Sequence, residues 1–359
     1  MALKELFSIA GTSIKSNFVT LKRPYKLNFA ITYWCNSRCL TCNIWQMKPK
    51  GEITLEEVRE FAKKNSYFKW IEITGGEPFM RSDIVEIVKA FKENSKSLYI
   101  VTIPTNSLTN HDTVIGKIKA MLDLGIPKLA ITVSLDGYRE LHDKIRGVPG
   151  NYDKAIDMYK RLAELKAVYR NLYFVFGYTM SNLNEGQFQK TYEAVKSEIP
   201  GITYNDFHIN LAQISDNYYG NGSLNIKPSG AAIADEIAYV VSKRKAKLDA
   251  VEMIEHTFLK GLVAYARTGI MPLHSRSLEA SVFMDSFGNI YPSIMWNQKI
   301  GNIRDSAYEL SPLLENPAAN SVRNAIKEGK EPVQWTSCEA YQAITGKISS
   351  MLILKSGQK

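Results

Sequence analysis

The amino-acid sequence predicts an α/β protein: a partial (β/α)6 barrel of the TIM type, followed by a small α+β C-terminal unit. Three observations lead to this prediction. Six short β-branched runs alternate with amphipathic segments from residue 26 to about residue 215, each run ends in a polar turn, and the alternation then stops. Strands that alternate with helices form right-handed βαβ units, and such units build a parallel sheet.

The expected strands follow one another along the first 215 residues. They are KLNFAITY (26–33), WIEIT (70–74), LYIVTIPT (98–105), KLAITVSL (128–135), LYFVFGYTM (172–180) and DFHINLAQI (206–214). The helix after the first strand is expected to begin near Thr54, because Thr54 and Glu57 have the spacing of a capping box. Further helices are expected near 83–94, 111–124, 151–169 and 186–198.

The chain divides into four expected parts. Residues 1–25 form an N-terminal amphipathic helix or arm, residues 26–215 the barrel, residues 216–270 a linker with helices near 229–246 and 251–267, and residues 271–359 the C-terminal unit. In this last unit, residues 281–296 predict a β-hairpin that turns on Ser286 to Asn289.

The composition indicates a protein of a reducing compartment. Four cysteines in 359 residues do not form a disulfide framework, so we expect a cytoplasmic protein. The net charge of +9 favours anionic partners, but there is no motif of a known RNA-binding module and no strong nucleic-acid signal. An amphipathic first helix followed by the basic run Leu21–Lys26 is typical of peripheral membrane contact; a helix that simply packs on the barrel is the alternative, which we prefer.

Three of the four cysteines lie within eight positions after the first expected strand. Cys35, Cys39 and Cys42 have the spacing C-x3-C-x2-C. A zinc site would need a fourth ligand, and no second pair or histidine is near in the sequence. A redox C-x-x-C motif would use Cys39 and Cys42 but leave Cys35 unexplained. Three thiolates on one loop can instead hold three irons of a four-iron cluster, which leaves the fourth iron open to an exogenous ligand.

With this loop at the end of the first strand, the sequence resembles the radical S-adenosylmethionine (SAM) enzymes. The resemblance covers roughly residues 26 to 215. It implies one 4Fe–4S cluster held by Cys35, Cys39 and Cys42, with the amino and carboxylate groups of SAM on the open iron. It further implies that one electron from the cluster splits SAM into methionine and a 5′-deoxyadenosyl radical.

The resemblance extends to the turns after the next two strands. GGEP (75–78) is similar to the family motif that receives the methionyl amino group, which implies cofactor contacts at Gly75, Gly76 and Glu77. Glycines in such a turn let the backbone approach a ligand closely. Asn106, in PTNS, stands where the family often has a polar contact to the ligand.

The turn after the fourth strand continues this pattern. SLDG (134–137) and HDKIRG (142–147) resemble the corresponding stretch of members related to the molybdenum-cofactor cyclases and to peptide-modifying enzymes. The resemblance implies that Ser134, with Asp136 in the same stretch, faces the ribose or carboxylate of SAM. It also implies a bidentate pair between Arg146 and the methionyl carboxylate.

One position departs from the family pattern. The family commonly has an aromatic residue just before the third cysteine, close to adenine, and this chain has Thr41 there. We therefore expect the contact to involve Thr41 itself, or a ring supplied by Trp34 or Trp45; loop or core packing of both tryptophans is the alternative.

The C-terminal segments resemble the auxiliary-cluster domain called twitch or SPASM. At the comparable cysteine positions this chain has Ser275, Ser293 and Gln334, and only Cys338 is left. We expect the shape of that domain without its cluster, since one thiolate cannot hold four irons. Cys338 is either a hydrogen-atom donor to a substrate radical or a buried remnant, and the remnant is favoured because a lone cysteine usually behaves as a small buried hydrophobe.

The resemblance thus implies a radical SAM enzyme with an electron donor of the ferredoxin or flavodoxin type. The substrate is a lipid, a peptide or a small metabolite, and no motif selects one of them. A non-catalytic protein that binds SAM or a cluster, as a sensor or scaffold, is the alternative, because auxiliary ligands and the expected aromatic residue are missing.

Overall fold

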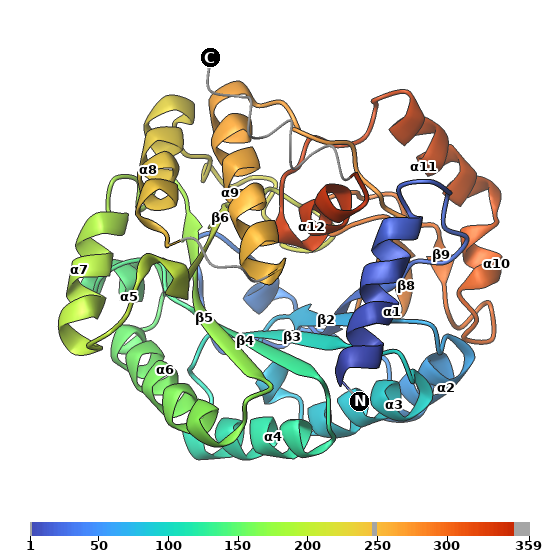
Figure 1. Ribbon diagram of the computed structural model, residues 1–359, viewed down its shortest axis with the longest axis horizontal. Coiled ribbons are helices and arrows are strands. Elements are labelled where there is room, and N and C mark those ends of the chain that lie inside the picture. The colour runs from blue at the N-terminus through green and yellow to red at the C-terminus, as the bar shows by residue number, and fades with distance from the viewer. Residues whose placement is uncertain (1, 246–249, 348–359) are drawn as a thin grey trace.

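The computed structural model describes residues 2–245 and 250–347 of the chain. Six parallel strands in the predicted order curve into an open barrel with helices outside (Figure 1). They are β1 (Lys26–Thr32), β2 (Trp70–Gly75), β3 (Ile100–Thr105), β4 (Lys128–Ser134), β5 (Leu172–Met180) and β6 (Phe207–Leu211). The sheet order β6-β5-β4-β3-β2-β1-β7-β8-β9 leaves β6 and β9 as edges, so the sheet is not closed.

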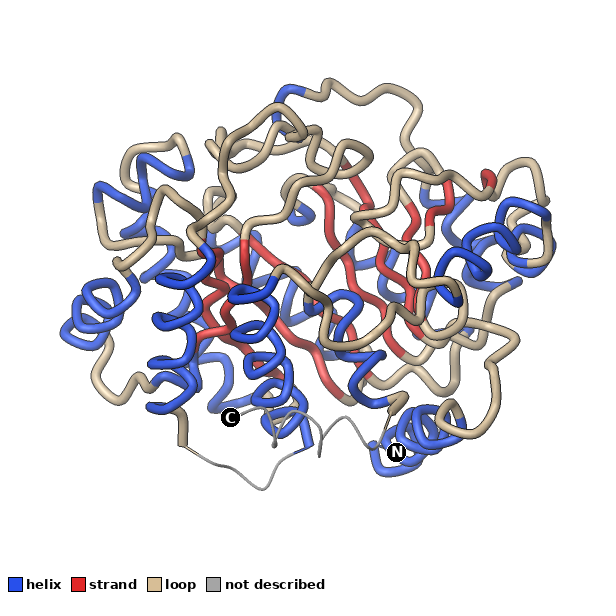
Figure 2. Tube along the Cα trace, turned by 90° about the horizontal axis from the view of Figure 1, so that it is seen from above, coloured by secondary structure: helices blue, strands red, loops and turns tan. Residues whose placement is uncertain are grey.

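Helices cover the outer face of these strands (Figure 2). The main ones are α2 (Leu55–Lys64), α3 (Ile84–Asn94), α4 (His111–Asp123), α6 (Asn151–Val168) and α7 (Phe188–Glu198). The capping box is present: the Glu57 amide donates to Thr54 Oγ1 at 3.3 Å, and the Thr54 amide donates to Glu57 Oε2 at 2.9 Å. The predicted barrel strands and helices are therefore confirmed, with their ends shifted by at most three residues.

Side chains on the barrel strands alternate between two environments. Residues that face the helices, such as Phe29, Ile73 and Ile131, are fully buried. Their neighbours Glu72 and Thr132, which face the barrel interior, are only half-buried. A packed barrel would bury both sets. On β2 and β4 the interior-facing side chains are therefore partly accessible, whereas Lys26 and Asn28 of β1, which face the same interior, are fully buried.

One helix was not expected from the sequence. The stretch HDKIRG lies mostly in α5 (Glu140–Arg146), which begins six residues after the end of β4. Gly147 ends the helix in the left-handed region, with a φ of 68°, and its amide bonds back to Asp143 and Lys144. This is the usual glycine C-cap. Arg146 therefore lies in the last turn of a short helix.

The C-terminal part extends the barrel sheet. It comprises α8 (Gly230–Lys243), α9 (Ala250–Thr268), β7 (Ser281–Met284), β8 (Asn289–Tyr291), β9 (Gly301–Asn302), α10 (Ser311–Leu314), α11 (Pro317–Lys327) and α12 (Ser337–Thr345). Strand β7 pairs parallel with β1 and antiparallel with β8, so the expected hairpin is present. The division into four parts stays a prediction, and residue 246 and residues 348–359 lie outside the described residues.

Helix α12 lies beside the open side of the barrel (Figure 1). Its Tyr341 stacks on Trp70 of β2 with ring centroids 6.0 Å apart and contacts Phe258 of α9 at 5.4 Å. Helix α1 (Ala2–Lys15) packs beside α12. Across residues 2–245 and 250–347, no helix combines the length and apolar character that a membrane span requires.

Candidate active site

The carboxyl ends of β1 to β4 bring the motif-bearing loops to one rim. The cysteine loop (residues 33–48) follows β1, and the GGEP turn follows β2. Asn106 comes directly after β3, and Asp136 lies two residues after β4. Ligands of parallel α/β sheets bind at this end of the strands. This rim is the candidate active site.

The cysteine loop is held at both of its sides. The Arg38 amide donates to the Arg146 carbonyl at 3.0 Å, which ties the loop to α5. The Glu52 carboxylate accepts a hydrogen bond from the Tyr33 amide at 2.6 Å, which fixes the point where the chain leaves β1. The loop thus has a set position although it has no regular secondary structure over Tyr33 to Cys42.

Each cysteine sulfur has a hydrogen-bond donor directed at it. The contacts are Asn106 Nδ2 to Cys35 Sγ at 3.8 Å, Arg146 Nη1 to Cys39 Sγ at 3.8 Å, and the Ile44 amide to Cys42 Sγ at 3.4 Å. Such donors stabilise thiolates and tune the iron–sulfur clusters that thiolates hold. The surroundings of the three sulfurs therefore suit cluster ligands.

The donor set fits a four-iron cluster better than a single metal ion. Burial raises the pKa of the Cys35 thiol to about 11 and of the Cys42 thiol to about 12, so metal binding must release their protons. Within the described ranges, no three His, Cys, Asp or Glu side chains converge on one ion. A zinc site needs that convergence. A 4Fe–4S cluster does not, since each thiolate binds its own iron.

The two glycines of GGEP are required by the cysteine loop itself. A Cβ at Gly75 would lie 2.1 Å from the Thr32 carbonyl oxygen, and Gly75 has a φ of 129°. A Cβ at Gly76 would lie 2.2 Å from the Trp34 carbonyl oxygen and 2.9 Å from Cys35 Cβ. Any side chain at Gly76 would therefore displace the first cysteine.

Glu77 of the same turn is buried and connects β2 to β3. Its carboxylate accepts hydrogen bonds from the Asn106 amide at 2.7 Å, from Thr105 Oγ1 at 3.2 Å and from the Phe79 amide at 3.2 Å. Burial raises its pKa to about 7, against the opposing effect of these donors. The Asn106 side chain in turn donates to Asn36 Oδ1 at 2.8 Å. Glu77 therefore positions Asn106 against the cysteine loop.

Asp136 and Arg146 form a buried ion pair beside the cysteines. Arg146 Nε lies 2.7 Å from Asp136 Oδ2, and the Thr179 amide donates to Asp136 Oδ1 at 2.9 Å. Burial raises the pKa of Asp136, while the guanidinium opposes that shift. Asp136 thus orients Arg146, whose Nη1 faces Cys39. Ser134, at the end of β4, is half-buried and faces the barrel interior opposite Gly177 of β5.

Thr41, which stands where the family commonly has an aromatic residue, contacts its surroundings through its backbone. Its carbonyl accepts a hydrogen bond from Asn221 Nδ2 at 2.9 Å. Trp34 and Trp45 are 49% and 37% exposed, so neither is a core residue. The cofactor contacts of Ser134, Asp136, Arg146, Asn106, Thr41 and the GGEP residues stay predictions.

Sequence reasoning missed a segment that joins these elements, which we call the strap (residues 213–221). Tyr218 Oη lies 2.5 Å from Thr74 Oγ1 and accepts from the Gly75 amide at 3.0 Å. Asn221 bonds the Thr41 carbonyl, as noted, and Asn43 Nδ2 donates to the Gly220 carbonyl at 2.9 Å. The strap therefore ties the cysteine loop to the glycine turn. Its composition predicts only a loop, and the side-chain contacts come from folding.

Cys338 faces the barrel interior from α12. Its thiol donates to Glu72 Oε1 at 2.9 Å, and Lys26 Nζ lies 2.6 Å from Glu72 Oε2. Cys338 and Cys42 pack against the same small cluster of buried residues, which includes Tyr218. Ser293 Oγ donates to Gln334 Oε1 at 3.2 Å. Two of the three positions that resemble auxiliary-cluster cysteine positions therefore lie within hydrogen-bond distance of each other.

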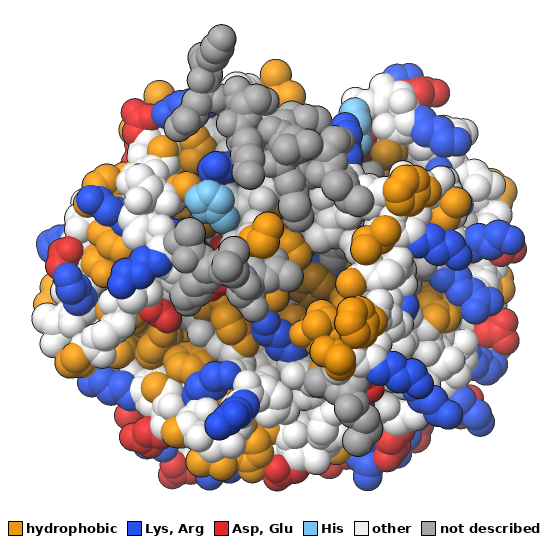
Figure 3. All heavy atoms as spheres, viewed as in Figure 1, with side chains coloured by type: hydrophobic (Ala, Val, Ile, Leu, Met, Phe, Trp, Pro, Cys, Tyr) orange, Lys and Arg blue, Asp and Glu red, His pale blue; other side chains and the backbone are white. Residues whose placement is uncertain are grey.

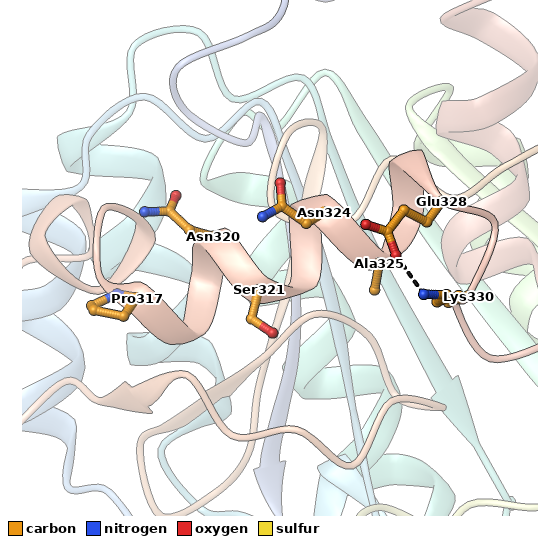
Figure 4. A pocket seen from close by; sticks show the side chains of 7 residues that line it. All are labelled: Pro317, Asn320, Ser321, Asn324, Ala325, Glu328 and Lys330. Carbon is orange, nitrogen blue, oxygen red and sulfur yellow. Dashed lines mark ion pairs between the residues drawn. The ribbon is translucent and has the colours of Figure 1, made fainter.

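The described residues line two notable surface cavities. One, of about 600 Å³, borders the cysteine loop and is lined by Cys35, Asn36, Ser37, Arg38, Trp45, Gln46 and Lys48. The other, of about 650 Å³, lies along α11 (Figure 4) and is lined by Pro317, Asn320, Ser321, Asn324, Ala325, Glu328 and Lys330. Its two charged side chains pair with each other at 2.7 Å, so it offers no free charge for chemistry. The cavity beside Cys35 is the one that belongs to the site.

Comparisons with known proteins agree with the sequence resemblance. The model of the radical SAM superfamily matches residues 29–195. A GTP 3′,8-cyclase of Cronobacter sakazakii is 28% identical over 148 residues, which cover 38% of this chain and 44% of that protein. A probable GTP 3′,8-cyclase of Thermococcus kodakarensis is 30% identical over 129 residues, 34% of this chain and 39% of that protein. The chain thus spans about two fifths of the length of these curated relatives.

Solved structures show the same fold over most of the chain. Streptococcus suis SuiB bound to S-adenosylmethionine has a TM-score of 0.60 at 17% identity, over 96% of this chain and 77% of that one. Native anSMEcpe with bound AdoMet and Cp18Cys peptide has a TM-score of 0.58 at 14% identity, over 94% of this chain and 100% of that one. At these identities the likeness is one of fold.

Proposed function

Because residues 29–195 match the model of the radical SAM superfamily, we propose that this protein is an enzyme that binds one 4Fe–4S cluster through Cys35, Cys39 and Cys42 and cleaves SAM reductively. When bound, the cluster and SAM supply a 5′-deoxyadenosyl radical that abstracts hydrogen from a substrate or adds to it. One observation carries the proposal: the three thiols share a rim with the other motif residues, and Arg146 and Asn106 donate toward their sulfurs.

The surrounding residues receive separate roles in this proposal. The backbone of the GGEP turn and the Asn106 side chain hold the methionyl end of SAM, while Arg146, oriented by Asp136, neutralises its carboxylate. Ser134 contacts the ribose, and the Thr41 region lies at the adenine. Glu77 acts as a positioning residue through Asn106. The proposed cofactor contacts are thus Gly75, Gly76, Asn106, Ser134, Arg146 and Thr41, with Glu77 and Asp136 as positioning residues.

The lining of the barrel interior supports a polar substrate. Thr132, Thr179 and Asn210 face the interior on β4, β5 and β6 and are half-buried. Hydroxyl and amide groups bind polar molecules, whereas an acyl chain would leave them without hydrogen bonds. A small polar metabolite or a peptide therefore suits this interior better than the acyl part of a lipid.

The reductant is proposed to be an acidic protein of the ferredoxin or flavodoxin type in the cytoplasm. Arg38 and Lys48 line the cavity beside Cys35, and both are exposed. Basic residues next to a redox centre attract an acidic partner and speed its encounter. The loop that carries the cluster ligands also presents the exposed Trp34 and Leu40, which suit a short-lived contact.

The test is anaerobic reconstitution followed by reduction with dithionite in the presence of SAM. We expect about four irons per chain, not about eight, since the twitch-like unit lacks its cysteines. We expect 5′-deoxyadenosine from the wild type and none above background from Cys35→Ala. A folded wild-type protein that binds the cluster and SAM but forms no 5′-deoxyadenosine would overturn the enzyme in favour of a sensor or scaffold.

A further inference from the structure

Helix α1 turns its polar side toward the rest of the protein. Lys69 Nζ donates to Ser8 Oγ at 2.8 Å and to Thr12 Oγ1 at 2.5 Å. One turn further, Arg276 Nη2 donates to the Ser16 carbonyl at 2.8 Å. Glu5, on the same side, is only 6% exposed. A surface helix of a globular protein normally buries its apolar side instead.

The opposite side of α1 is apolar and exposed. Leu3, Phe7 and Ile14 are 65%, 67% and 53% exposed, and their spacing of four and seven residues places them on one face of a helix. Phe18, just beyond the helix, is 78% exposed. In Figure 3, hydrophobic side chains gather over the position that α1 has in Figure 1. We call Leu3, Phe7, Ile14 and Phe18 the apolar stripe.

Basic residues border the apolar stripe, and no exposed acid interrupts it. The exposed cations are Lys4 and Lys15 in α1 and Lys22 and Arg23 after it. Glu5 is the one acidic residue in the first 25 positions, and it is buried. Among the residues that the structure describes, other exposed large apolar side chains, such as Val168 at 75%, do not have this combination of a helical stripe and a basic border.

We propose that α1 and residues 16–23 form a docking site for an anionic lipid surface. The apolar stripe would enter the boundary between headgroups and acyl chains, and the four cations would contact lipid phosphates. The helix has 14 residues, so it would lie in the plane of the surface. The preferred expectation of an N-terminal helix that packs on the rest of the protein agrees with the contacts of α1, but the packed side is the polar one, so the apolar stripe stays exposed.

Lipid is favoured over a second copy of this chain by charge. A symmetric pair would bring two sets of the same four cations together, and like charges in contact oppose association. A bilayer of anionic lipid complements both parts of the surface, since it offers acyl chains to the apolar stripe and phosphates to its basic border. The proposal does not depend on the catalytic function.

The test is sedimentation of the full chain with vesicles. The probes are phosphatidylglycerol–phosphatidylcholine vesicles and pure phosphatidylcholine vesicles, each at low and high salt. We expect the wild type to sediment with the anionic vesicles and to lose binding in high salt. The double variant Phe7→Ser, Ile14→Ser should bind at least about tenfold more weakly. Val168→Ser and Ile270→Ser, which change residues 75% and 69% exposed, are the matched controls and should bind as the wild type does.

Two results would overturn the docking site. In the first, the wild type fails to bind anionic vesicles, or the double variant binds as well as the wild type. In the second, light scattering finds a dimer that the double variant abolishes, which would assign the stripe to a second copy. Circular dichroism and thermal unfolding of the double variant establish that it is folded, so a loss of binding reports on the surface. Iron content and SAM cleavage are measured separately and test the proposed function alone.

Discussion

Arg146 contacts a carboxylate and a cysteine sulfur at once: its Nε lies 2.7 Å from Asp136 Oδ2, and its Nη1 lies 3.8 Å from Cys39 Sγ. One guanidinium therefore links the end of β4 to the cysteine loop. Its planar shape allows both contacts at once, which a lysine ammonium could not provide. Replacing Arg146 by lysine therefore tests the shape of the guanidinium separately from its positive charge.

We expect Arg146→Lys to weaken SAM binding about tenfold while leaving the iron content near that of the wild type. The lysine keeps a positive charge near Cys39 but loses the fork that pairs with a carboxylate. Arg161→Lys, in an exposed ion pair with Asp157 on α6, is the matched control. Equilibrium dialysis with labelled SAM and iron analysis measure the two quantities. Equal affinity in the variant and the wild type would reject the carboxylate contact.

Gly76→Ala should impair cluster loading. The new methyl group would lie 2.2 Å from the Trp34 carbonyl oxygen and 2.9 Å from Cys35 Cβ, so the cysteine loop must move. Overpacking of this kind destabilises a fold by about 1–3 kcal/mol. Here the strained segment is the loop that carries the cluster ligands. Gly116→Ala in α4 meets nothing within 4 Å and should be neutral or stabilising. Iron per chain after reconstitution is the measurement; full loading of Gly76→Ala would contradict the close packing.

The barrel was predictable because its signals are local. The spacing of hydrophobic residues, the β-branched runs and the Thr54–Glu57 capping box each indicate a strand or a helix within one segment of the sequence. The convergence of Cys35, Gly76 and Asn106 on one rim followed from the parallel topology alone. The roles of Asp136 and Glu77 did not follow, because both act through side-chain contacts between segments far apart in the chain.

The strap marks where sequence reasoning ends. Tyr218 and Asn221 belong to a stretch rich in Asn, Gly and Ser, which predicts a loop and nothing about its partners. Their hydrogen bonds to Gly75 and Thr41 arise only once β6 has returned the chain to the rim. The inverted orientation of α1 was likewise invisible, since a hydrophobic period shows which face is apolar but not which face is buried.

Tyr218→Phe should reduce SAM affinity several-fold and leave the melting temperature almost unchanged. The variant keeps the ring contacts with Tyr33 and Phe283 and removes only the hydroxyl that bonds Thr74 and Gly75. Tyr219→Phe is the matched control within the strap, since its hydroxyl bonds neither the glycine turn nor the cysteine loop. SAM affinity and thermal unfolding are compared for both variants. A parallel loss in both would mean that the hydroxyl of Tyr218 has no special part in holding the turn.

Glu339→Gln should make stability less dependent on pH. Burial raises the pKa of Glu339 from 4.5 to about 7, although Ser281 and Ser277 donate to its carboxylate. The folded protein therefore binds more protons than the unfolded chain between pH 4.5 and pH 7, and the free energy of unfolding falls as pH rises through that window. Glutamine removes this titration. Between pH 4 and pH 8 the wild type should therefore lose about 3 kcal/mol of unfolding free energy that the variant keeps.

Urea unfolding at pH 4, 6 and 8 measures the effect of Glu339→Gln. Some pH dependence should remain, because burial also raises the pKa of Glu77 to about 7. Glu315→Gln, at an exposed position after α10, should follow the wild-type curve. A variant whose stability varies with pH as steeply as that of the wild type would place the folded-state pKa of Glu339 near its ordinary value.

Cys338 should deliver a solvent-derived hydrogen to a radical formed at the rim. Its thiol is half-buried, donates a hydrogen bond to Glu72 at 2.9 Å, and packs against the same cluster of residues as Cys42. If SAM is cleaved in D2O without substrate, the 5′-deoxyadenosyl radical takes the exchangeable atom from sulfur, which gives monodeuterated 5′-deoxyadenosine and a thiyl radical. The added low-potential reductant and a solvent deuteron then restore the thiol.

Cys338→Ala should still cleave SAM but yield unlabelled product by mass spectrometry. Unlabelled product from the wild type would leave Cys338 as the buried remnant that its isolation in the sequence favours, whereas absence of any 5′-deoxyadenosine would reject SAM cleavage itself.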